Sequence, residues 1–315
     1  MTEKCVIGID VSKAKLDVGK PEQKRVGLWK NNASQRDELC AWLKEQETEL
    51  VVLEASGGYE SKLVRDLIEN NIPVSVVNPG RVRALAMAEG LLAKTDKIDA
   101  RLIARFGLKM NPRLHTQKDL DQQALSQWVS RRRQLVQMVT AEKNRRQTAS
   151  EAIQESIDSH IAWMQAEIQA LETHIAQAIS DHPTWNETAQ RIQTAPGIGF
   201  ITAATLVAEL PELGQLSRQQ IAALVGLAPF NNESGKKKRK SRIFGGRSQI
   251  RPALYMGTLA AIRFNPVIKA FYHRLLDKGK PTKVVITACM RKFLVILNSM
   301  VKSGQDWVNK FQPNT

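Results

Sequence analysis

The 315-residue sequence has little of what holds small cross-linked folds together. It contains three cysteines, at Cys5, Cys40 and Cys289, and five histidines. Three scattered cysteines are too few for a disulfide framework, and no histidine and cysteine are paired closely enough to predict a structural zinc site. The chain is nevertheless long enough for two or three domains with a substantial hydrophobic core.

Long apolar runs are also missing. We find no run that approaches the roughly 18–20 residues of a membrane-spanning helix, and the longest candidate, 199–210, contains glycine and an acidic residue. The N-terminus lacks the basic start and apolar stretch of a secretory signal. The composition, 43% hydrophobic and 24% charged, is typical of a soluble globular protein. We therefore expect no membrane partner and a cytoplasmic, nucleoid-associated location.

Acidic residues are in deficit. The sequence has 46 Lys and Arg against 31 Asp and Glu, a net charge of +15 and a pI near 9.9. This balance is typical of proteins that bind polyanions, and nucleic acid is the first expectation. A membrane surface is the weaker alternative, because no basic amphipathic helix with an aromatic face stands out. Charge alone does not separate DNA from RNA.

Glycine and proline are absent from residues 118–182, which predicts long helices. The apolar residues of the second half recur in alternating steps of four and three, which is a heptad pattern. They are Ile157, Ile161, Met164, Ile168, Leu171, Ile175 and Ala178, and Leu125, Val129, Leu135 and Val139 indicate an earlier helix. The pattern fits an antiparallel helical hairpin within one chain. It fits equally a coiled coil that joins chains into a dimer or tetramer.

The first 110 residues alternate between strand and helix patterns. Strands are predicted at 5–10, 15–20, 25–30, 50–56 and 73–78, the last ended by Pro79-Gly80. Helices are predicted from Ser34, where Asp37 suggests a capping box, over 59–70, and through Leu102, Ile103 and Phe106. This order of elements is that of a ribonuclease-H-like mixed sheet, so the fold class is α/β, followed by α-helical regions.

Four acidic residues occupy distinctive places in this pattern. Asp10 ends the first strand and Glu54 ends the fourth, and these two ends are neighbours in the expected sheet. Asp96 and Asp99 lie three apart, on one face of a helix start. Four clustered carboxylates repel unless cations neutralise them. Mg²⁺ prefers oxygen ligands, and two ions can clamp a phosphoryl transfer. We therefore predict a site for two Mg²⁺ ions, with Mn²⁺ able to substitute; ordinary turn and cap roles are the simpler alternative.

A basic stretch, 231–251, carries a serine next to a glycine. Its cationic residues are Lys236, Lys237, Lys238, Arg239, Lys240, Arg242, Arg247 and Arg251, against the single acid Glu233. We expect them to contact a nucleic-acid backbone, although a solvated charge run is the alternative. Attack by Ser234 would conserve a phosphodiester as a phosphoserine link, which permits rejoining. From the residues alone, a serine that merely contacts phosphate is the simpler interpretation.

The segment APGIG, 195–199, is a glycine turn that enters a helix. It resembles the hairpin of helix-hairpin-helix modules, in which glycine amides such as those of Gly197 and Gly199 approach a phosphate at a helix N-terminus. Phe200 and Ile201 stand where such modules often carry Lys or Arg. A purely structural turn is therefore an equal alternative.

Several motifs occur in order along nearly the whole chain: GIDVSKAKLDV, VVLEASGGY, VVNPGRVRALA, KTDKIDARLIARF, APGIG, GLAPFNNESG and RPALYM. Together they resemble the DEDD transposases of insertion-sequence family one hundred and ten, whose relatives include the Piv-type DNA invertases. One departure is Arg251-Pro252, where the family usually has a basic pair before ALYM.

The resemblance implies three domains. A RuvC-like catalytic domain over 1–115 would carry Asp10, Glu54, Asp96 and Asp99. A helical coiled-coil region over 116–185 would link it to a C-terminal transposase domain over 186–315. That last domain is expected to be mainly helical, with the helix-hairpin-helix-like motif, and to supply Ser234 of the ESG motif as nucleophile. The resemblance also implies DNA as substrate and a structured noncoding guide RNA as partner.

The favoured function is thus RNA-guided DNA transposition through a serine–DNA link, with a site-specific DNA invertase of the same family as the alternative. A RuvC-like junction nuclease would hydrolyse DNA with metal-activated water and would not depend on Ser234. A non-enzymatic nucleic-acid-binding protein is the third possibility, and the complete set of acids argues against it.

Overall fold

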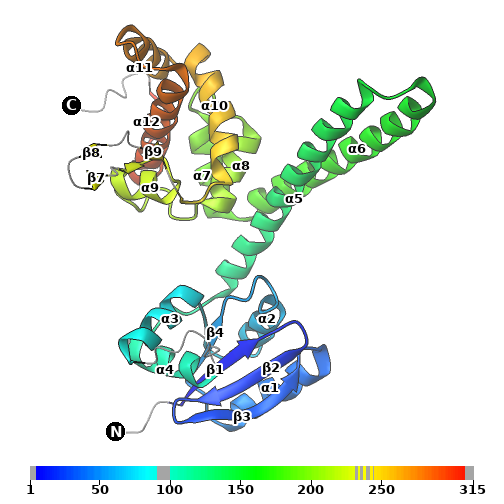
Figure 1. Cartoon of the computed structure of the whole chain (residues 1–315), viewed down its shortest axis with the longest axis vertical. Coiled ribbons are helices and arrows are strands. Elements are labelled where there is room, and N and C mark those ends of the chain that lie inside the picture. Colours follow the sequence, from blue (N-terminus) through cyan, green and yellow to red (C-terminus); the bar gives the residue numbers. More distant parts are fainter. Residues whose placement is uncertain are drawn as a thin grey trace. The chain divides into compact units, whose positions relative to one another are not determined.

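The computed structural model describes residues 5–90, 100–230, 233–234, 237–238, 242–243 and 245–308. The chain divides into two compact units, Met1–Asp121 and Gln122–Thr315, which are described separately below. Figure 1 labels the helices and strands of both units.

The first unit is built on a five-stranded mixed sheet with the order β3-β2-β1-β4-β5 (Figure 1). Strands β1 (Val6–Val11), β2 (Lys15–Lys20) and β3 (Gln23–Lys30) form an antiparallel meander. Strands β4 (Leu50–Glu54) and β5 (Val74–Val77) continue the sheet parallel to β1. The sequence-based predictions of five strands, and of the first and fourth as neighbours, are confirmed.

Helices cover both faces of this sheet, which explains why its central strands are apolar along their length. On one face, α1 (Ala33–Glu45) and α2 (Ser61–Glu69) pack against Ile7, Ile9 and Leu53. On the other face, α3 (Pro79–Ala88) and α4 (Ala100–Met110) pack against Val6, Leu50 and Val52.

Helix α4 approaches the sheet to within backbone contact. A Cβ atom added to Gly8 of β1 would overlap the carbonyl oxygen of Ala100 and the amide of Ala104. One turn further along, a Cβ on Gly107 would lie 2.5 Å from Val52 Cγ2. Small residues on both partners therefore allow this approach, and they fix the start of α4 above the middle of β1.

One prediction for this unit is wrong, and one helix was not predicted. Helix α1 is capped by Asn32, whose side chain accepts a hydrogen bond from the Gln35 amide, so it begins before Ser34. The Pro79-Gly80 pair does not only end a strand: Pro79 is the first residue of helix α3, and the Asn78 side chain caps it by accepting from the Gly80 amide. Proline suits this first helical position, because the amide it lacks has no helical partner there.

Helix α5 (Gln117–Arg146) and helix α6 (Glu151–Asp181) form an antiparallel hairpin. Its seam is formed by Leu135, Val139, Ile161 and Met164, with Ile157, Ile168 and Leu171 packed beside them. Ion pairs Arg132–Glu172 and Arg146–Asp158 join the two helices across the seam. The heptad residues thus pair within the chain, which is the first of the two interpretations drawn from the sequence.

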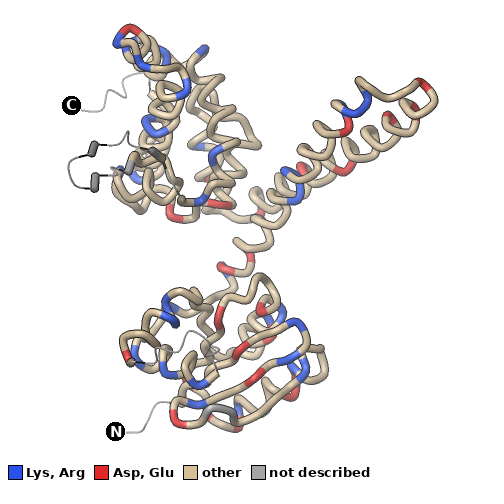
Figure 2. The backbone as a smooth tube through the Cα atoms, in the orientation of Figure 1, with Lys and Arg blue, Asp and Glu red and all other residues tan. Residues whose placement is uncertain are grey.

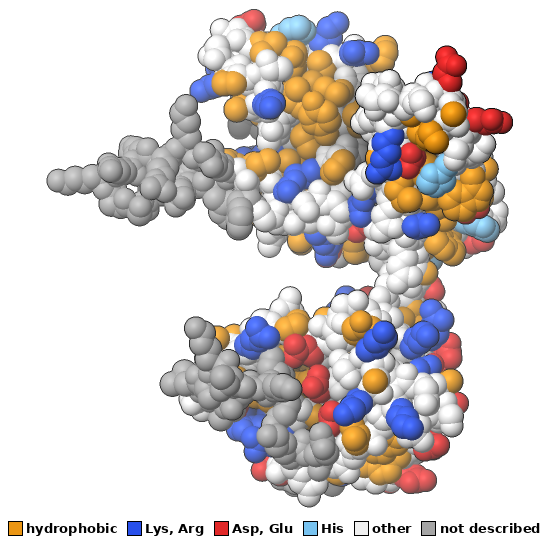
Figure 3. Space-filling model, turned by 45° about the vertical axis from the view of Figure 1, so that its right-hand side comes forward, with side chains coloured by type: hydrophobic (Ala, Val, Ile, Leu, Met, Phe, Trp, Pro, Cys, Tyr) orange, Lys and Arg blue, Asp and Glu red, His pale blue; other side chains and the backbone are white. Residues whose placement is uncertain are grey.

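The outer face of the hairpin keeps large side chains in solvent. Trp128 and Trp163 are 39% and 54% exposed. Each lies beside a histidine of α6, Trp128 at 6.1 Å from His174 and Trp163 at 6.3 Å from His160 between ring centroids. Figure 3 shows hydrophobic and histidine side chains side by side on the exposed surface of the hairpin.

The rest of the second unit is mainly helical, as expected. It contains α7 (Pro183–Gln193), α8 (Phe200–Glu209), α9 (Arg218–Leu224), α10 (Ile250–Phe264), α11 (Pro266–Asp277) and α12 (Thr282–Ser303). Between α9 and α10 lie four two-residue strands: β6 (Pro229–Phe230) pairs with β9 (Arg242–Ile243), and β7 (Glu233–Ser234) pairs with β8 (Lys237–Lys238).

Helix α12 is the central core helix of this part. Ten of its residues are buried, including Phe293, Leu294 and Leu297. By length and hydropathy, this helix could cross a membrane. The sequence analysis did not expect an apolar helix of this length. Packing explains its hydropathy, since 56% of its 18-residue apolar window is buried among the other helices.

Candidate functional site

Asp10 and Glu54 come together at one edge of the sheet. Strands β1 and β4 are parallel, with Ile9 opposite Leu53, so the two acids follow side by side at the carboxyl ends of their strands. Side chains alternate between the faces of a strand. Asp10 therefore shares the face of Gly8, and Glu54 that of Val52, which is the face covered by α4.

The electrostatics agree with this pairing. Burial raises the pKa of the Glu54 carboxyl, and the nearby negative charge of Asp10 raises it further. Arg83 acts in the opposite direction and lowers it. A carboxylate that is half-buried beside a second one is stabilised by any cation that reaches the pair.

Arg83 is a residue that the sequence analysis did not select. It is exposed and lies on α3, which begins directly after β5, and Val77 of β5 is opposite Glu54. Its neighbour Arg81 is engaged with the Phe106 ring, 5.4 Å from the centroid. The signal that could have found Arg83 was Asn78-Pro79, a helix cap and first helical residue, which place Arg83 in the first turns of a helix at the acidic edge.

The loop after Glu54 is fixed by another acid. The Glu60 carboxylate accepts hydrogen bonds from the Ser56 amide at 3.1 Å, the Ser56 hydroxyl at 2.7 Å and the Gly58 amide at 2.9 Å. Burial alone would raise the pKa of Glu60, but these hydrogen bonds outweigh it and the pKa is lowered. Glu60 thus serves the conformation of the loop that follows Glu54.

The other two predicted acids, Asp96 and Asp99, lie outside the described residues. Ala100, which follows Asp99 in sequence, is the first residue of α4, and its carbonyl group lies against Gly8, two residues before Asp10. In the described part of the chain, no three His, Cys, Asp or Glu residues form a group that could hold a metal ion. Asp10 and Glu54 are therefore the described half of the predicted set.

Ser234 lies on β7, where its backbone is opposite Lys237 of β8. The structure describes the backbones of Lys237, Lys238 and Arg242 in short strands. Lys236, Arg239 and Lys240 lie outside the described residues. Figure 2 shows other Lys and Arg residues of the second unit spread over several of its helices.

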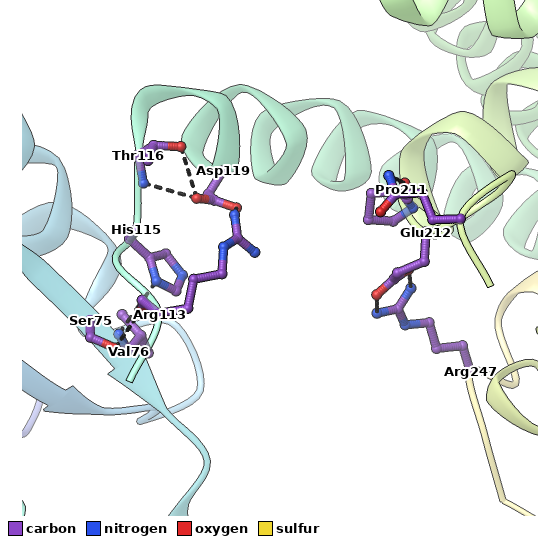
Figure 4. A network of polar contacts seen from close by, with 10 residues as sticks. Ser75, Val76, Arg113, His115, Thr116, Asp119, Pro211, Glu212 and Arg247 are labelled. Carbon is purple, nitrogen blue, oxygen red and sulfur yellow. Dashed lines mark hydrogen bonds and ion pairs between the residues drawn. The ribbon is translucent and has the colours of Figure 1, made fainter. Parts of the chain in front are cut away.

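Arg247 and Arg251, predicted as nucleic-acid contacts, both use their guanidinium groups inside the chain. Arg247 forms two hydrogen bonds to the Glu212 carboxylate, at 2.5 and 2.7 Å (Figure 4). It forms a third to the Glu209 carbonyl at 3.0 Å. Arg251 donates to the carbonyl of Gly245 at 2.8 Å and reaches those of Val225 and Gly226 at 3.4 Å. Their role in binding nucleic acid stays a prediction.

The two glycines of the APGIG turn have different environments. Gly197 has a φ of 107°, and an added Cβ would lie 2.7 Å from the Gly257 carbonyl and the Ala261 Cβ of α10. Its packing against α10 is enough to require glycine. Gly199 is exposed, caps the N-terminus of α8, and has nothing within 4 Å of an added Cβ. No such packing requirement applies to Gly199, and its role as a phosphate contact stays a prediction.

Comparison with known proteins gives a consistent picture. Residues 7–151 match a family model of IS110 DEDD transposases, and residues 189–273 match the model described as Transposase IS116/IS110/IS902 family. The pilin gene-inverting proteins of Moraxella bovis and Moraxella lacunata are each 30% identical over 96% of this chain and 97% of their own length. The transposase for insertion sequence element IS1111A of Coxiella burnetii is 26% identical over 68% of this chain and 66% of its own length.

Proposed function

The chain belongs to the IS116/IS110/IS902 family of transposases, and on that premise we propose that it cuts and rejoins DNA with metal-binding carboxylates and a serine nucleophile. The observation that carries the proposal is the placement of Asp10 and Glu54 side by side at the ends of two parallel strands. Mixed sheets of this strand order, with the acids at that edge, fit the RuvC-like domain expected from the motifs.

We assign Asp10, Glu54, Asp96 and Asp99 to the binding of Mg²⁺. The residues present fit such a group: burial and the neighbouring Asp10 raise the pKa of the Glu54 carboxyl, and a divalent cation would relieve this repulsion. The contact of Ala100 with Gly8 supports the inclusion of the two aspartates that precede α4. When bound, Mg²⁺ supplies charge stabilisation for oxygens that attack and leave phosphorus.

The chain's own residues then have distinct tasks. Arg83, exposed beside the acids, binds a phosphate of the DNA strand. The Ser234 oxygen forms a bond to phosphorus and gives up its proton, while one DNA oxygen leaves phosphorus and takes up a proton. The resulting phosphoserine link conserves the bond, so the reverse reaction with a second DNA end rejoins the strands. The Lys residues of the loop hold the DNA backbone.

The wider assembly is part of the same proposal. Residues 1–115 form the carboxylate domain, 116–185 the helical region and 186–315 the domain that carries Ser234. A structured noncoding RNA guides the reaction, and a dimer or tetramer brings two DNA duplexes together. The +15 net charge is the property of the chain that supports both nucleic-acid partners.

Site-specific inversion is the second candidate. The similarity to two pilin gene-inverting proteins covers 96% of this chain, whereas the similarity to the IS1111A transposase covers 68%. Inversion and transposition use the same strand chemistry. DNA that flanks the gene separates them, because only an insertion element carries its own ends on both sides.

The test is a denaturing gel of the full chain with Mg²⁺, labelled DNA from the flanks of its gene and the flanking transcript. The proposal predicts a protein–DNA adduct in wild type that is lost in both Ser234→Ala and Asp10→Asn. Ser159→Ala and Asp37→Asn are matched controls, since both residues are exposed and lie outside the proposed site. Cleavage without an adduct that survives Ser234→Ala would instead identify a hydrolytic nuclease.

A further inference from the structure

The loop that carries Ser234 is joined to the helices by a stem that backbone and side-chain contacts hold in place. We propose that Arg247, held by Glu212, and Arg251 position the serine through this stem and do not bind nucleic acid. The stem consists of residues 224–230 together with 242–243 and 245–251. This inference rests on the proposed role of Ser234, and the experiment below separates the two.

The two sides of the stem touch through their backbones. The Arg247 amide donates to the Leu224 carbonyl at 2.8 Å, and β6 pairs with β9 through Pro229 opposite Ile243. Gly226 and Gly246 have φ values of 73° and 68°. An added Cβ on Gly226 would overlap the Gly245 carbonyl oxygen, and one on Gly246 would overlap the Gly226 amide. Both glycines are thus required by conformation and by close approach.

Arg251 stabilises the contact between Gly226 and the Gly245–Gly246 turn by hydrogen bonds. Its Nη1 atom lies within hydrogen-bond distance of three carbonyls, those of Val225 and Gly226 on one side of the stem and that of Gly245 on the other. Carbonyl groups in such a turn have no strand or helix partner, and a guanidinium group is suited to satisfy several of them at once.

Arg247 attaches the stem to the helical body. Both of its terminal nitrogens bind the Glu212 carboxylate (Figure 4). One of them also binds the Glu209 carbonyl at the end of α8. The side chains of this pair are 31% and 32% exposed, so solvent screens them only in part. A two-fold contact of this kind fixes direction as well as distance. To bind a phosphate, Arg247 would have to leave Glu212 with an unpaired charge.

The position of Ser234 follows from the stem. Phe230, the last residue of β6, precedes Ser234 by four residues, and the β7–β8 pair that holds Ser234 consists of two residues on each side. So short a pair does not fix its own orientation on the helices. The direction in which the serine is presented is therefore set by the attachment of the stem.

The experiment compares Arg247→Gln, Glu212→Gln and the exchanged pair Arg247→Glu with Glu212→Arg in the full chain. It measures the rate of adduct formation, the DNA affinity at several salt concentrations, and the rate of tryptic cleavage within residues 236–242. A displacement of about 1 Å can lower a rate about 100-fold. We expect both single variants to slow adduct formation about 10- to 100-fold with DNA affinity unchanged, and the exchange to restore part of the rate.

The opposite assignment makes different predictions. If Arg247 binds a phosphate, Arg247→Gln weakens DNA binding and lowers the salt slope by about 1, whereas Glu212→Gln leaves adduct formation intact. That result overturns the inference. Glu187→Gln, which breaks the exposed pair with Arg191 on α7, is the control for loss of an ion pair elsewhere. Arg247→Lys, which keeps one contact to Glu212, replaces any variant that does not fold.

Tryptic cleavage separates the inference from the proposed function. If wild type cuts DNA without a serine adduct, the nucleophile assignment fails. In that case, faster tryptic cleavage of the loop in both single variants still shows that the pair holds the stem. Unchanged tryptic cleavage in both variants would overturn the inference that the Arg247–Glu212 pair holds the stem.

Discussion

The two acids of the sheet and the serine of the loop are held in place by different means. Asp10 and Glu54 stand on strands that are each hydrogen-bonded on both sides and buried between two layers of helices. Ser234 stands on a pair of two-residue strands whose stem is fixed by glycine contacts and by two arginines. The fold itself positions the acids, whereas a few side chains position the serine.

Because of this difference, substitutions in the two regions should affect stability and activity differently. At the acidic edge, a substitution that disturbs the packing should damage the whole first unit, while a change of the acids themselves should spare it. In the stem, the side chains of Arg247, Glu212 and Arg251 are partly exposed and lie outside the hydrophobic core, so that a change of these side chains should lower activity with little effect on stability. The predictions below test this contrast, beginning with the largest expected effect.

Asp10→Asn should abolish chemistry and preserve the fold. Loss of one ligand charge should lower the rate of DNA cleavage by about 1000-fold, which corresponds to about 4 kcal/mol of transition-state stabilisation. Thermal unfolding should be unchanged or slightly improved, because the repulsion between Asp10 and Glu54 disappears. Cleavage assays and a thermal melt of the same preparation measure both. A large fall in melting temperature would contradict the contrast.

Gly8→Ala should affect stability and chemistry together. The new Cβ would overlap the Ala100 carbonyl and the Ala104 amide, and these backbone atoms cannot rotate away. We expect a loss of about 3 kcal/mol in the free energy of unfolding, as for overpacking in a tight core, and a displaced α4. Chemical denaturation gives the free energy. Gly199→Ala is a control for the entropy of glycine, since Gly199 has a φ of −87° and open space around an added Cβ.

The sequence predicts the sheet well because its strands are marked by apolar runs that end at polar residues. The same applies to α5 and α6, where Leu135, Val139, Ile161 and Met164 form the seam their spacing predicted. Helix α3 was missed because Asn78-Pro79-Gly80 is typical of turns as well as of helix starts.

The candidate site was predictable only where strand order determines it. Asp10 and Glu54 follow from the ends of neighbouring parallel strands. Arg83 belongs to the missed helix. Arg247 was selected by charge alone, and charge in a sequence does not reveal that Glu212, 35 residues earlier, already pairs with it. Gly197 was selected as a phosphate contact, but its partner is α10, which a local motif does not identify.

Arg83→Gln should lower activity less than a change of the acids. A single charge-assisted hydrogen bond to a phosphate contributes about 2 kcal/mol, so the rate should fall about 30-fold, and Arg83→Lys should recover part of it. The effect should appear in cleavage assays with little change in the melting temperature, since Arg83 is exposed. Arg65→Gln, an exposed arginine of α2 on the other face of the sheet, is the matched control. An equal loss of activity in both variants would mean that Arg83 acts only through the general positive charge of the surface.

Glu60→Gln provides the smallest test, because Glu60 fixes the loop that follows Glu54 by local contacts, as the stem does for the serine. Its pKa is lowered in the folded chain, so its charge contributes stability above its unfolded pKa of about 4.3. That contribution is lost as the pH falls through the folded value. At pH 7 we expect the free energy of unfolding of the variant to be about 1 kcal/mol lower than that of wild type. The difference is modest because solvent screens this half-buried group. The difference from wild type should shrink between pH 5 and pH 3 in denaturation experiments, while Glu69→Gln, an exposed residue of the same helix, should show no such trend. A difference that persisted at pH 3 would mean that the shape of the side chain, and not its charge, holds the loop beside the acids.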